Sequence, residues 1–177
     1  LIPELNRLID REIALADEGK QGRIILKMNA LQDPAMIDRL YEASEHGVQI
    51  DLIVRGICCL IPGQSYSRNI RVTRIVDSFL EHARIWYFGN DGTPKVFMGS
   101  PDWMRRNLYR RIEAITPVLA PDLRDNLIEM LDIQLADNQK ACWVDDKLQN
   151  IFKKRTPGTP AVRAQYTFYD WLNQKDN

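Results

Sequence analysis

The fold is decided by the stretch RIILKMNALQDPAMIDRLYEASEHGVQIDLIV, residues 23–54. Two short runs rich in β-branched and other apolar side chains, 23–28 and 48–54, are typical of buried strands. Between them, apolar side chains recur at helical spacing over 34–46, and Gly47 ends that helix. A strand, a helix and a strand of these lengths form a βαβ unit. The stretch therefore predicts parallel strands joined by a right-handed crossover.

The same spacing rules extend the prediction to the rest of the chain. Further helices are expected over 2–17, 70–80, 121–136 and 161–173. Further strands are expected over 83–88, 95–98, 111–119 and 140–144, and loops after Gly63 and over 153–160. Asn90-Asp91-Gly92 is a strong hairpin signal, and Pro117 favours an edge strand. The expected architecture is an α/β domain with a mixed, mostly parallel sheet flanked by helices.

Length and composition suit a single domain over residues 1–177. The chain is 45% hydrophobic and 27% charged, as in an ordinary globular protein. No apolar run approaches the roughly 20 residues that span a bilayer. The three cysteines match neither a disulfide framework nor a zinc spacing, so we expect reduced core residues of a cytoplasmic protein. Because the chain begins at Leu1 rather than at a methionine, we expect a piece of a longer polypeptide.

Positive charge is concentrated in the middle of the chain. Residues 55–111 hold ten Lys or Arg and four Asp or Glu, whereas the whole chain holds 24 of each kind. A local excess of this kind indicates an anionic ligand at one site. Clustered arginines suit phosphate groups, although a single arginine is more often a solvated surface residue. The pI near 6.9 argues against nucleic acid, and no P-loop motif is present.

Polar residues follow the two strands of the βαβ unit, where parallel sheets bind ligands. Lys27 and Asn29 close the first strand and Arg55 closes the second, although Lys27 and Asn29 could equally be an edge pair facing solvent. His82 is the leading catalytic candidate, because an imidazole can transfer a proton or stabilise phosphoryl charge. The alternative is a hydrogen-bonded histidine at a helix end. His46 is interpreted as a helix C-terminal cap.

Four stretches carry a resemblance to a known family. They are Lys27–Pro34, Asp51–Leu60, Phe79–His82 and Gly99–Leu108. Together they resemble the last domain of bacterial polyphosphate kinase, the family that uses a phosphohistidine. The resemblance covers nearly the whole chain, and it implies a phospholipase D-like fold.

The phospholipase D motif itself is altered in this sequence. That motif reads H-x-K-x4-D followed by Gly-Ser-x-Asn. Here Arg84 stands at the lysine, Gly89 at the aspartate and Asp102 at the asparagine. These departures argue against phosphodiester hydrolysis.

The resemblance implies reversible transfer of the γ-phosphate of ATP to inorganic polyphosphate. In the family the phosphorylated histidine lies in the preceding domain, so the isolated domain is expected to be inactive. His82 matches the second essential histidine, and Arg55 and Arg111 match residues that contact ATP phosphates. The wider set expected to bind ATP or phosphate adds Lys27, Asn29, Ser100 and Arg106.

The resemblance also implies cofactors and partners. Mg²⁺ is expected in the full-length enzyme, with its ligands outside this segment. The expected partners are ATP, ADP, polyphosphate, the remaining domains of the same polypeptide and further copies in a homo-oligomer. The expected location is the cytoplasm, and peripheral association with the inner membrane stays open. Two rival functions also stay open: a phospholipase D-like phosphodiesterase, and a non-catalytic module for polyphosphate binding or assembly.

Overall fold

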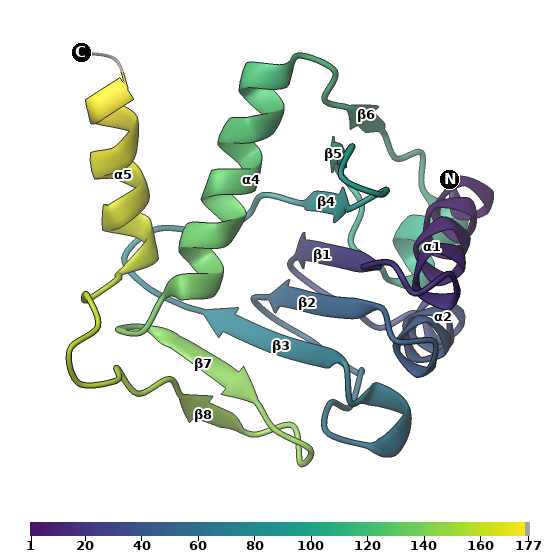
Figure 1. The fold of residues 1–177 in the computed structure, drawn as a ribbon, viewed down its shortest axis with the longest axis horizontal. Coiled ribbons are helices and arrows are strands. Elements are labelled where there is room, and N and C mark those ends of the chain that lie inside the picture. Colours follow the sequence, from purple (N-terminus) through teal and green to yellow (C-terminus); the bar gives the residue numbers. More distant parts are fainter. Residues whose placement is uncertain (176–177) are drawn as a thin grey trace.

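The structure, a computed structural model, describes residues 1–175. Its helices are α1 (Ile2–Asp17), α2 (Pro34–Glu45), the 3₁₀ turn η1 (Ser65–Ser67), α3 (Arg105–Arg110), α4 (Pro121–Ala136) and α5 (Ala164–Lys175). Its strands are β1 (Arg23–Met28), β2 (Gln49–Val54), β3 (Ile70–Ile75), β4 (Ile85–Phe88), β5 (Lys95–Gly99), β6 (Ile115–Pro117), β7 (Ala141–Val144) and β8 (Asn150–Phe152). The strands form one sheet in the order β6-β5-β4-β1-β2-β3-β7-β8 (Figure 1).

The predicted βαβ unit forms the centre of this sheet. β1 and β2 pair in parallel, with Ile24 opposite Ile50, and β3 continues the parallel arrangement beside β2. The Asp33 side chain caps α2 by accepting from the Met36 N–H at 3.1 Å. The mixed α/β class with flanking helices is confirmed.

The expectation of a mostly parallel sheet is corrected. The pairings β1–β4, β4–β5, β5–β6, β3–β7 and β7–β8 are all antiparallel. Two of them, β4–β5 and β7–β8, are hairpins, and a tight turn can join only antiparallel strands. β5 and β6 are joined through α3, and the other two pairings are between strands that are not consecutive in the chain. In the predicted hairpin between β4 and β5, the Thr93 N–H donates to the Asn90 carbonyl at 3.2 Å. The two residues between them, Asp91 and Gly92, have positive φ, 55° and 78°, as the central residues of a type I′ turn require.

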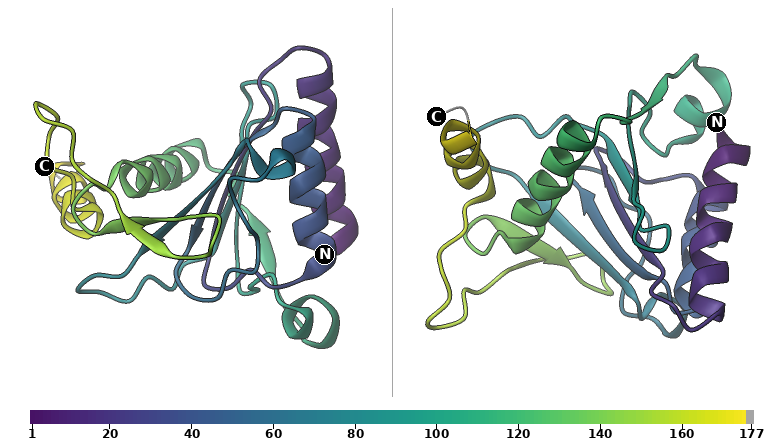
Figure 2. Two further views of the ribbon diagram at one scale, coloured as in Figure 1. Left: turned by 90° about the horizontal axis from the view of Figure 1, so that it is seen from below. Right: turned by 45° about the horizontal axis from the view of Figure 1, so that its top comes forward.

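Helices cover both faces of the sheet (Figure 2). Alternate side chains of β1 explain this, because Ile24 and Leu26 point to the face under α1 and α2, whereas Ile25 points to the face under α4. Trp86 and Trp103 belong to the first core, with ring centroids 6.0 Å apart. Within residues 1–175, no helix combines the length and apolar character needed to cross a bilayer.

The predicted helix over 70–80 is wrong. Residues 70–75 are β3, and the segment 76–84 that follows is irregular. Val72 and Ile75 fit either element by spacing, but β3 pairs with both β2 and β7, which favours a strand. Val76 and Leu80, which fall on the apolar positions of such a helix, are 67% and 72% exposed.

Smaller corrections concern the second half of the chain. The strand predicted over 111–119 is reduced to β6, because residues 105–110 form α3 and residues 111–114 are irregular. The short strand β8 was not predicted, and α5 begins at Ala164 rather than at residue 161. Of the three cysteines expected in the core, Cys142 is buried and Cys59 is exposed.

Candidate functional site

Three loops meet beyond the carboxyl ends of β1 and β2. The Gly56 N–H donates to the Asn29 carbonyl at 2.8 Å, and the Leu31 N–H donates to the Ile57 carbonyl at 2.8 Å. On the other side, the Trp103 N–H donates to the Ala30 carbonyl at 3.0 Å. These backbone hydrogen bonds place residues 29–31, which follow β1, between two other segments. Residues 56–57, which follow β2, lie on one side, and residues 99–103, which include the Gly-Ser-Pro-Asp motif, lie on the other. The site is therefore built on rigid strand ends.

Asn29 and Arg55 contact each other at this edge, as the strand-end argument predicted. The Arg55 Nε donates to the Asn29 Oδ1 at 3.0 Å, which fixes the orientation of the amide. Asn29 is only 8% exposed, and its Nδ2 has no hydrogen-bond partner within residues 1–175. A buried donor without a partner is unfavourable unless a ligand or water accepts from it. The pair therefore offers N–H donors suited to an anionic oxygen.

Lys27 lies in the same region but is engaged by a carboxylate. Its Nζ is 2.7 Å from the Glu81 Oε2, and the two side chains are 3% and 10% exposed. Burial lowers the pKa of Lys27, and Glu81 partly offsets that shift. The Glu81 Oε2 also accepts from the Gln134 Nε2 at 3.0 Å, and its Oε1 accepts from the Gln165 Nε2 at 2.9 Å. Lys27 is therefore a buried, paired cation rather than an edge residue facing solvent.

His82 is exposed and contacts Arg84. The Arg84 Nη1 lies 3.2 Å from the ring Nδ1 and 3.1 Å from the His82 carbonyl oxygen. Arg84 in turn forms an ion pair with Asp102, with Nη2 and Oδ2 3.0 Å apart. The Asp102 Oδ1 accepts from the Asn29 N–H at 2.7 Å. A chain of contacts thus joins His82 to Asn29 and, through it, to Arg55.

Asp102 is stabilised in its charged form by these partners. Burial alone would raise the pKa of Asp102, but hydrogen bonds from Arg84 and from the Asn29 N–H outweigh it. The net effect lowers the pKa below the ordinary range. Arg84 and Asp102 therefore neutralise each other at the two positions where the phospholipase D motif has lysine and asparagine.

Ser100 and Arg111 belong to a second group beside this one. The Ser100 hydroxyl donates to Glu113, and the Asn107 Nδ2 donates to the same carboxylate at 2.6 Å. These hydrogen bonds lower the pKa of Glu113, with further contributions from the charges of Arg111 and Arg84. Ser100 thus contacts a carboxylate in this structure rather than an open anion site.

The structure brings only part of the predicted site into contact. Asn29, Arg55 and His82 are joined by short contacts through Arg84 and Asp102. Lys27 instead binds Glu81, the residue before His82. Arg111 is exposed and adjoins the group through Glu113. Arg106 is exposed on α3. Within residues 1–175, no hydrogen bond or ion pair joins His82 directly to Arg55 or Arg111.

The sequence prediction missed four polar side chains that hold this region together. They are Glu81, Glu113, Gln134 and Gln165. For Gln134 a signal existed, because it follows Leu131, Met130 and Leu127 by three, four and seven residues and so falls on the apolar face of the predicted helix. In the structure it is 3% exposed. The glutamine at 165 carried no signal, because an amide near a helix start is common on protein surfaces.

The donors gathered here do not suit a divalent metal ion. Within the part of the chain that the structure describes, no three His, Cys, Asp or Glu side chains lie close enough to hold one. The nearby carboxylates of Glu81 and Asp102 are already paired with Lys27 and Arg84. Mg²⁺ prefers oxygen ligands in octahedral geometry, and these residues supply mainly N–H donors.

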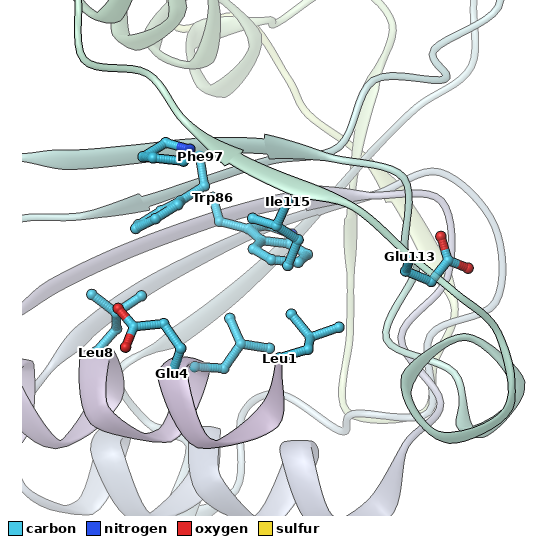
Figure 3. Close-up of a pocket in the computed structure, with 9 residues that line it drawn as sticks. Leu1, Glu4, Leu8, Trp86, Phe97, Glu113 and Ile115 are labelled. Atoms are coloured by element: carbon cyan, nitrogen blue, oxygen red, sulfur yellow. The ribbon is translucent and has the colours of Figure 1, made fainter.

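An apolar hollow of about 370 Å³ lies elsewhere, between α1 and the strands β4 to β6. Leu8, Trp86 and Phe97 line it, and Glu113 stands at its rim with the carboxylate directed away from these side chains (Figure 3). Its walls offer little to a phosphate group. The charged edge of the sheet, rather than this hollow, has the chemistry of an anion site.

Comparison with known proteins identifies the family. The family model described as polyphosphate kinase C-terminal domain 2 matches residues 1–165. The chain belongs to this family. The polyphosphate kinase of Halalkalibacterium halodurans is 49% identical over 94% of the chain, and that of Escherichia coli K12 is 44% identical over 95%. The chain spans about a quarter of these relatives' length, 24% in both cases.

Solved structures agree with the family and the fold. The polyphosphate kinase of Porphyromonas gingivalis matches 99% of the chain and 27% of its own, with a TM-score of 0.97 and 54% identity. A phospholipase D family member, Nuc from Salmonella typhimurium, matches 80% of the chain and 88% of its own, with a TM-score of 0.52 and 16% identity. The latter likeness extends to the fold alone, and it confirms the predicted phospholipase D-like architecture.

Proposed function

We propose that this chain is a catalytic domain of a polyphosphate kinase, which transfers the γ-phosphate of ATP reversibly to inorganic polyphosphate. The phosphorylated histidine would come from another domain of the longer polypeptide. His82, Arg55 and Asn29 would surround the transferring phosphoryl group. Lys27, Ser100, Arg106 and Arg111 would complete the positive surroundings of the phosphate chain.

The single observation that carries the proposal is the pairing of Asn29 with Arg55 at the carboxyl end of the parallel strands. Phosphoryl transfer places its charge on peripheral oxygens, so catalysis depends on positioned donors more than on covalent chemistry by the domain itself. The Asn29 Nδ2, on an amide oriented by Arg55 and without a partner among residues 1–175, is a donor of that kind. His82 could add a proton or a positive charge at the leaving oxygen.

The environment of Arg84 and Asp102 argues against the rival phosphodiesterase. In that reaction the corresponding lysine and asparagine would contact a phosphodiester. Here the two side chains bind each other, so neither is free for that role. The proposed kinase uses ATP and ADP as nucleotides, and its Mg²⁺ would be held by residues outside this chain. Its proposed partners are the remaining domains of the polypeptide and further copies in a homo-oligomer, and its proposed location is the cytoplasm.

The two histidines of the chain allow a matched test in the full-length enzyme. We expect His82→Ala to lower the kcat of ATP-dependent polyphosphate synthesis by at least about a hundredfold, because it removes an acid, base or charge from the reaction. His46→Ala is the control, since His46 caps α2 and contacts Asp17 at 2.7 Å. Synthesis by the His82 variant at the rate of the control would refute the proposal.

Arg55 separates catalysis from mere binding of polyphosphate. We expect Arg55→Ala to lower kinase activity and ATP affinity together, because in the proposed site Arg55 would bind phosphate and it also orients Asn29. Equilibrium binding of polyphosphate and steady-state kinetics on the same preparation would measure the two effects. Full kinase activity combined with weakened polyphosphate binding would instead favour the binding or assembly module.

A further inference from the structure

The segment 76–84, which carries His82, has little internal structure of its own. It joins β3 to β4 without a helix or strand, and Phe79 is 61% exposed. One backbone hydrogen bond, from the His82 N–H to the Leu80 carbonyl at 3.2 Å, lies within it. A segment of this kind takes a defined position only through contacts with the rest of the molecule.

The first turn of α5 and the residue before it supply many of these contacts. The Arg163 guanidinium binds the Asp77 carboxylate through two hydrogen bonds of 2.8 and 2.7 Å, and it donates to the Ser78 hydroxyl at 3.0 Å. Two-point pairing between a guanidinium and a carboxylate fixes direction as well as distance. Asp77 has a side chain only 3% exposed, so this pair is largely shielded from water on that side.

Gln165 makes a more specific contact with the same segment. The Phe79 N–H donates to its Oε1 at 2.8 Å, and its Nε2 donates to the Phe79 carbonyl at 2.8 Å. The side-chain amide therefore satisfies both backbone groups of Phe79, as a neighbouring strand would. The same Nε2 reaches the Glu81 Oε1 at 2.9 Å. One side chain thus fixes two residues, and the second of them adjoins His82.

Glu81 completes the arrangement from the side of the sheet. Its carboxylate is bound by Lys27 of β1, by Gln134 of α4 and by Gln165 of α5. Both charges of the Lys27–Glu81 pair are buried, so the loss of one partner leaves an uncompensated charge. The residue next to His82 is therefore held from three elements at once.

We propose that Gln165, assisted by Arg163, is a positioning residue for His82, so that the start of α5 belongs to the catalytic apparatus. This inference rests on the proposed function, because it assigns His82 a role in phosphoryl transfer. The alternative is that these contacts merely attach α5 to the domain. A positioning role predicts a loss in kcat with little change in KM, because a displaced His82 affects the transition state more than substrate binding.

The test uses the full-length enzyme and two substitutions of Gln165. Gln165→Ala removes all its contacts, whereas Gln165→Glu keeps the size and places a carboxylate against Glu81. We expect each to lower kcat about tenfold to a hundredfold, with KM for ATP within about twofold. Hydrogen–deuterium exchange of a peptide covering 76–84 should rise, while exchange of β1 and β2 stays unchanged and reports an intact sheet.

Lys175→Ala is the matched control on the same helix. Lys175 contacts Asn126 of α4 and lies 4.7 Å from the Trp171 ring centroid, so its loss weakens the attachment of α5 without touching segment 76–84. We expect its kcat to stay within about twofold of the unmodified enzyme.

Two results would overturn the inference. One is unchanged kcat in both Gln165 variants while His82→Ala is inactive, which would leave the proposed function intact. The other is a Lys175→Ala loss equal to that of Gln165→Ala. A fully active His82→Ala enzyme would instead remove the proposed function, and the inference with it.

Discussion

Replacing Asp102 by asparagine restores the residue of the phospholipase D motif and tests the energetic role of the Arg84–Asp102 pair. The Asp102 and Arg84 side chains are 9% and 14% exposed, so the pair is largely removed from water. In Asp102→Asn the Arg84 charge keeps its burial but loses its counter-charge. The new amide oxygen can still accept from the Asn29 N–H. The change therefore keeps the shape of the side chain and removes its charge, and it also places an NH2 donor where the Oδ2 accepted from the Arg84 Nη2 at 3.0 Å.

The size of the effect follows from these contacts. Removing one partner of a buried pair typically costs 3–5 kcal/mol. Because Arg84 retains some solvent and its contact with the His82 carbonyl, we expect about 2–3 kcal/mol here. For a domain of this length that corresponds to a fall in Tm of roughly 5–10 °C. Asp125→Asn, at an exposed carboxylate paired with Arg124, should change stability by less than about 1 kcal/mol.

Urea and thermal unfolding of the 177-residue chain, followed by circular dichroism, would measure both variants. The folded-state pKa of Asp102 is lowered, so its stabilisation is present above the ordinary aspartate pKa and disappears as the pH falls through the folded value. The difference between Asp102→Asn and the unmodified chain should shrink accordingly. Arg84→Met combined with Asp102→Asn should recover part of the loss. A single variant as stable as Asp125→Asn would refute the reasoning.

Three further predictions concern other parts of the structure. Glu12→Ala should cost about 2–3 kcal/mol in urea unfolding because it leaves two partly buried backbone N–H groups, of Arg23 and Asn90, without an acceptor. Glu12→Gln keeps one acceptor oxygen for the two groups, so it should cost about half of that. Burial lowers the pKa of Lys153 to about 8, so between pH 8 and 10.5 the unfolded chain binds more protons than the folded one. The free energy of unfolding of the unmodified chain, measured relative to that of Lys153→Met, should therefore rise over this pH range. A difference between the two that does not change with pH would contradict this. Gly56→Ala should lower kcat of the full-length enzyme about tenfold, because its Cβ would lie 2.9 Å from the Asn29 carbonyl oxygen; unchanged kinetics would show that the loop adapts.

The core of the fold could be predicted because its signals are local. β1 and β2 are short, nearly continuous apolar runs, α2 carries helical spacing, and Gly47 has the positive φ of 94° expected beyond a helix end. The segment 70–80 could not be assigned in this way. Its apolar spacing fits a helix, but residues 70–75 pair with β2 and β7 and so form a strand, and residues 76–80 are irregular.

The candidate site also has a part that local sequence patterns predict and a part that they do not. Lys27, Asn29 and Arg55 were predictable because the carboxyl ends of adjacent parallel strands always lie together. The partners Glu81 and Gln165 were not, because their contacts depend on where an irregular segment meets α5. Sequence rules give the rigid part of the site and miss the side chains that position the rest.

The contacts of Asp102 connect the altered phospholipase D motif to the Asn29 amide, whose Nδ2 has no partner among residues 1–175. With arginine and aspartate in place of lysine and asparagine, the two motif positions bind each other, and Asp102 also accepts from the Asn29 N–H. That bond holds the backbone of Asn29 while Arg55 fixes its side chain, so the amide donor has a defined direction. In the proposed reaction the anion would therefore be bound by Asn29 and Arg55 rather than by the former motif residues. Arginine and aspartate together carry one positive charge fewer than lysine and asparagine, so in the proposed reaction the N–H donors to phosphate would come from the ends of β1 and β2 instead of from these two positions.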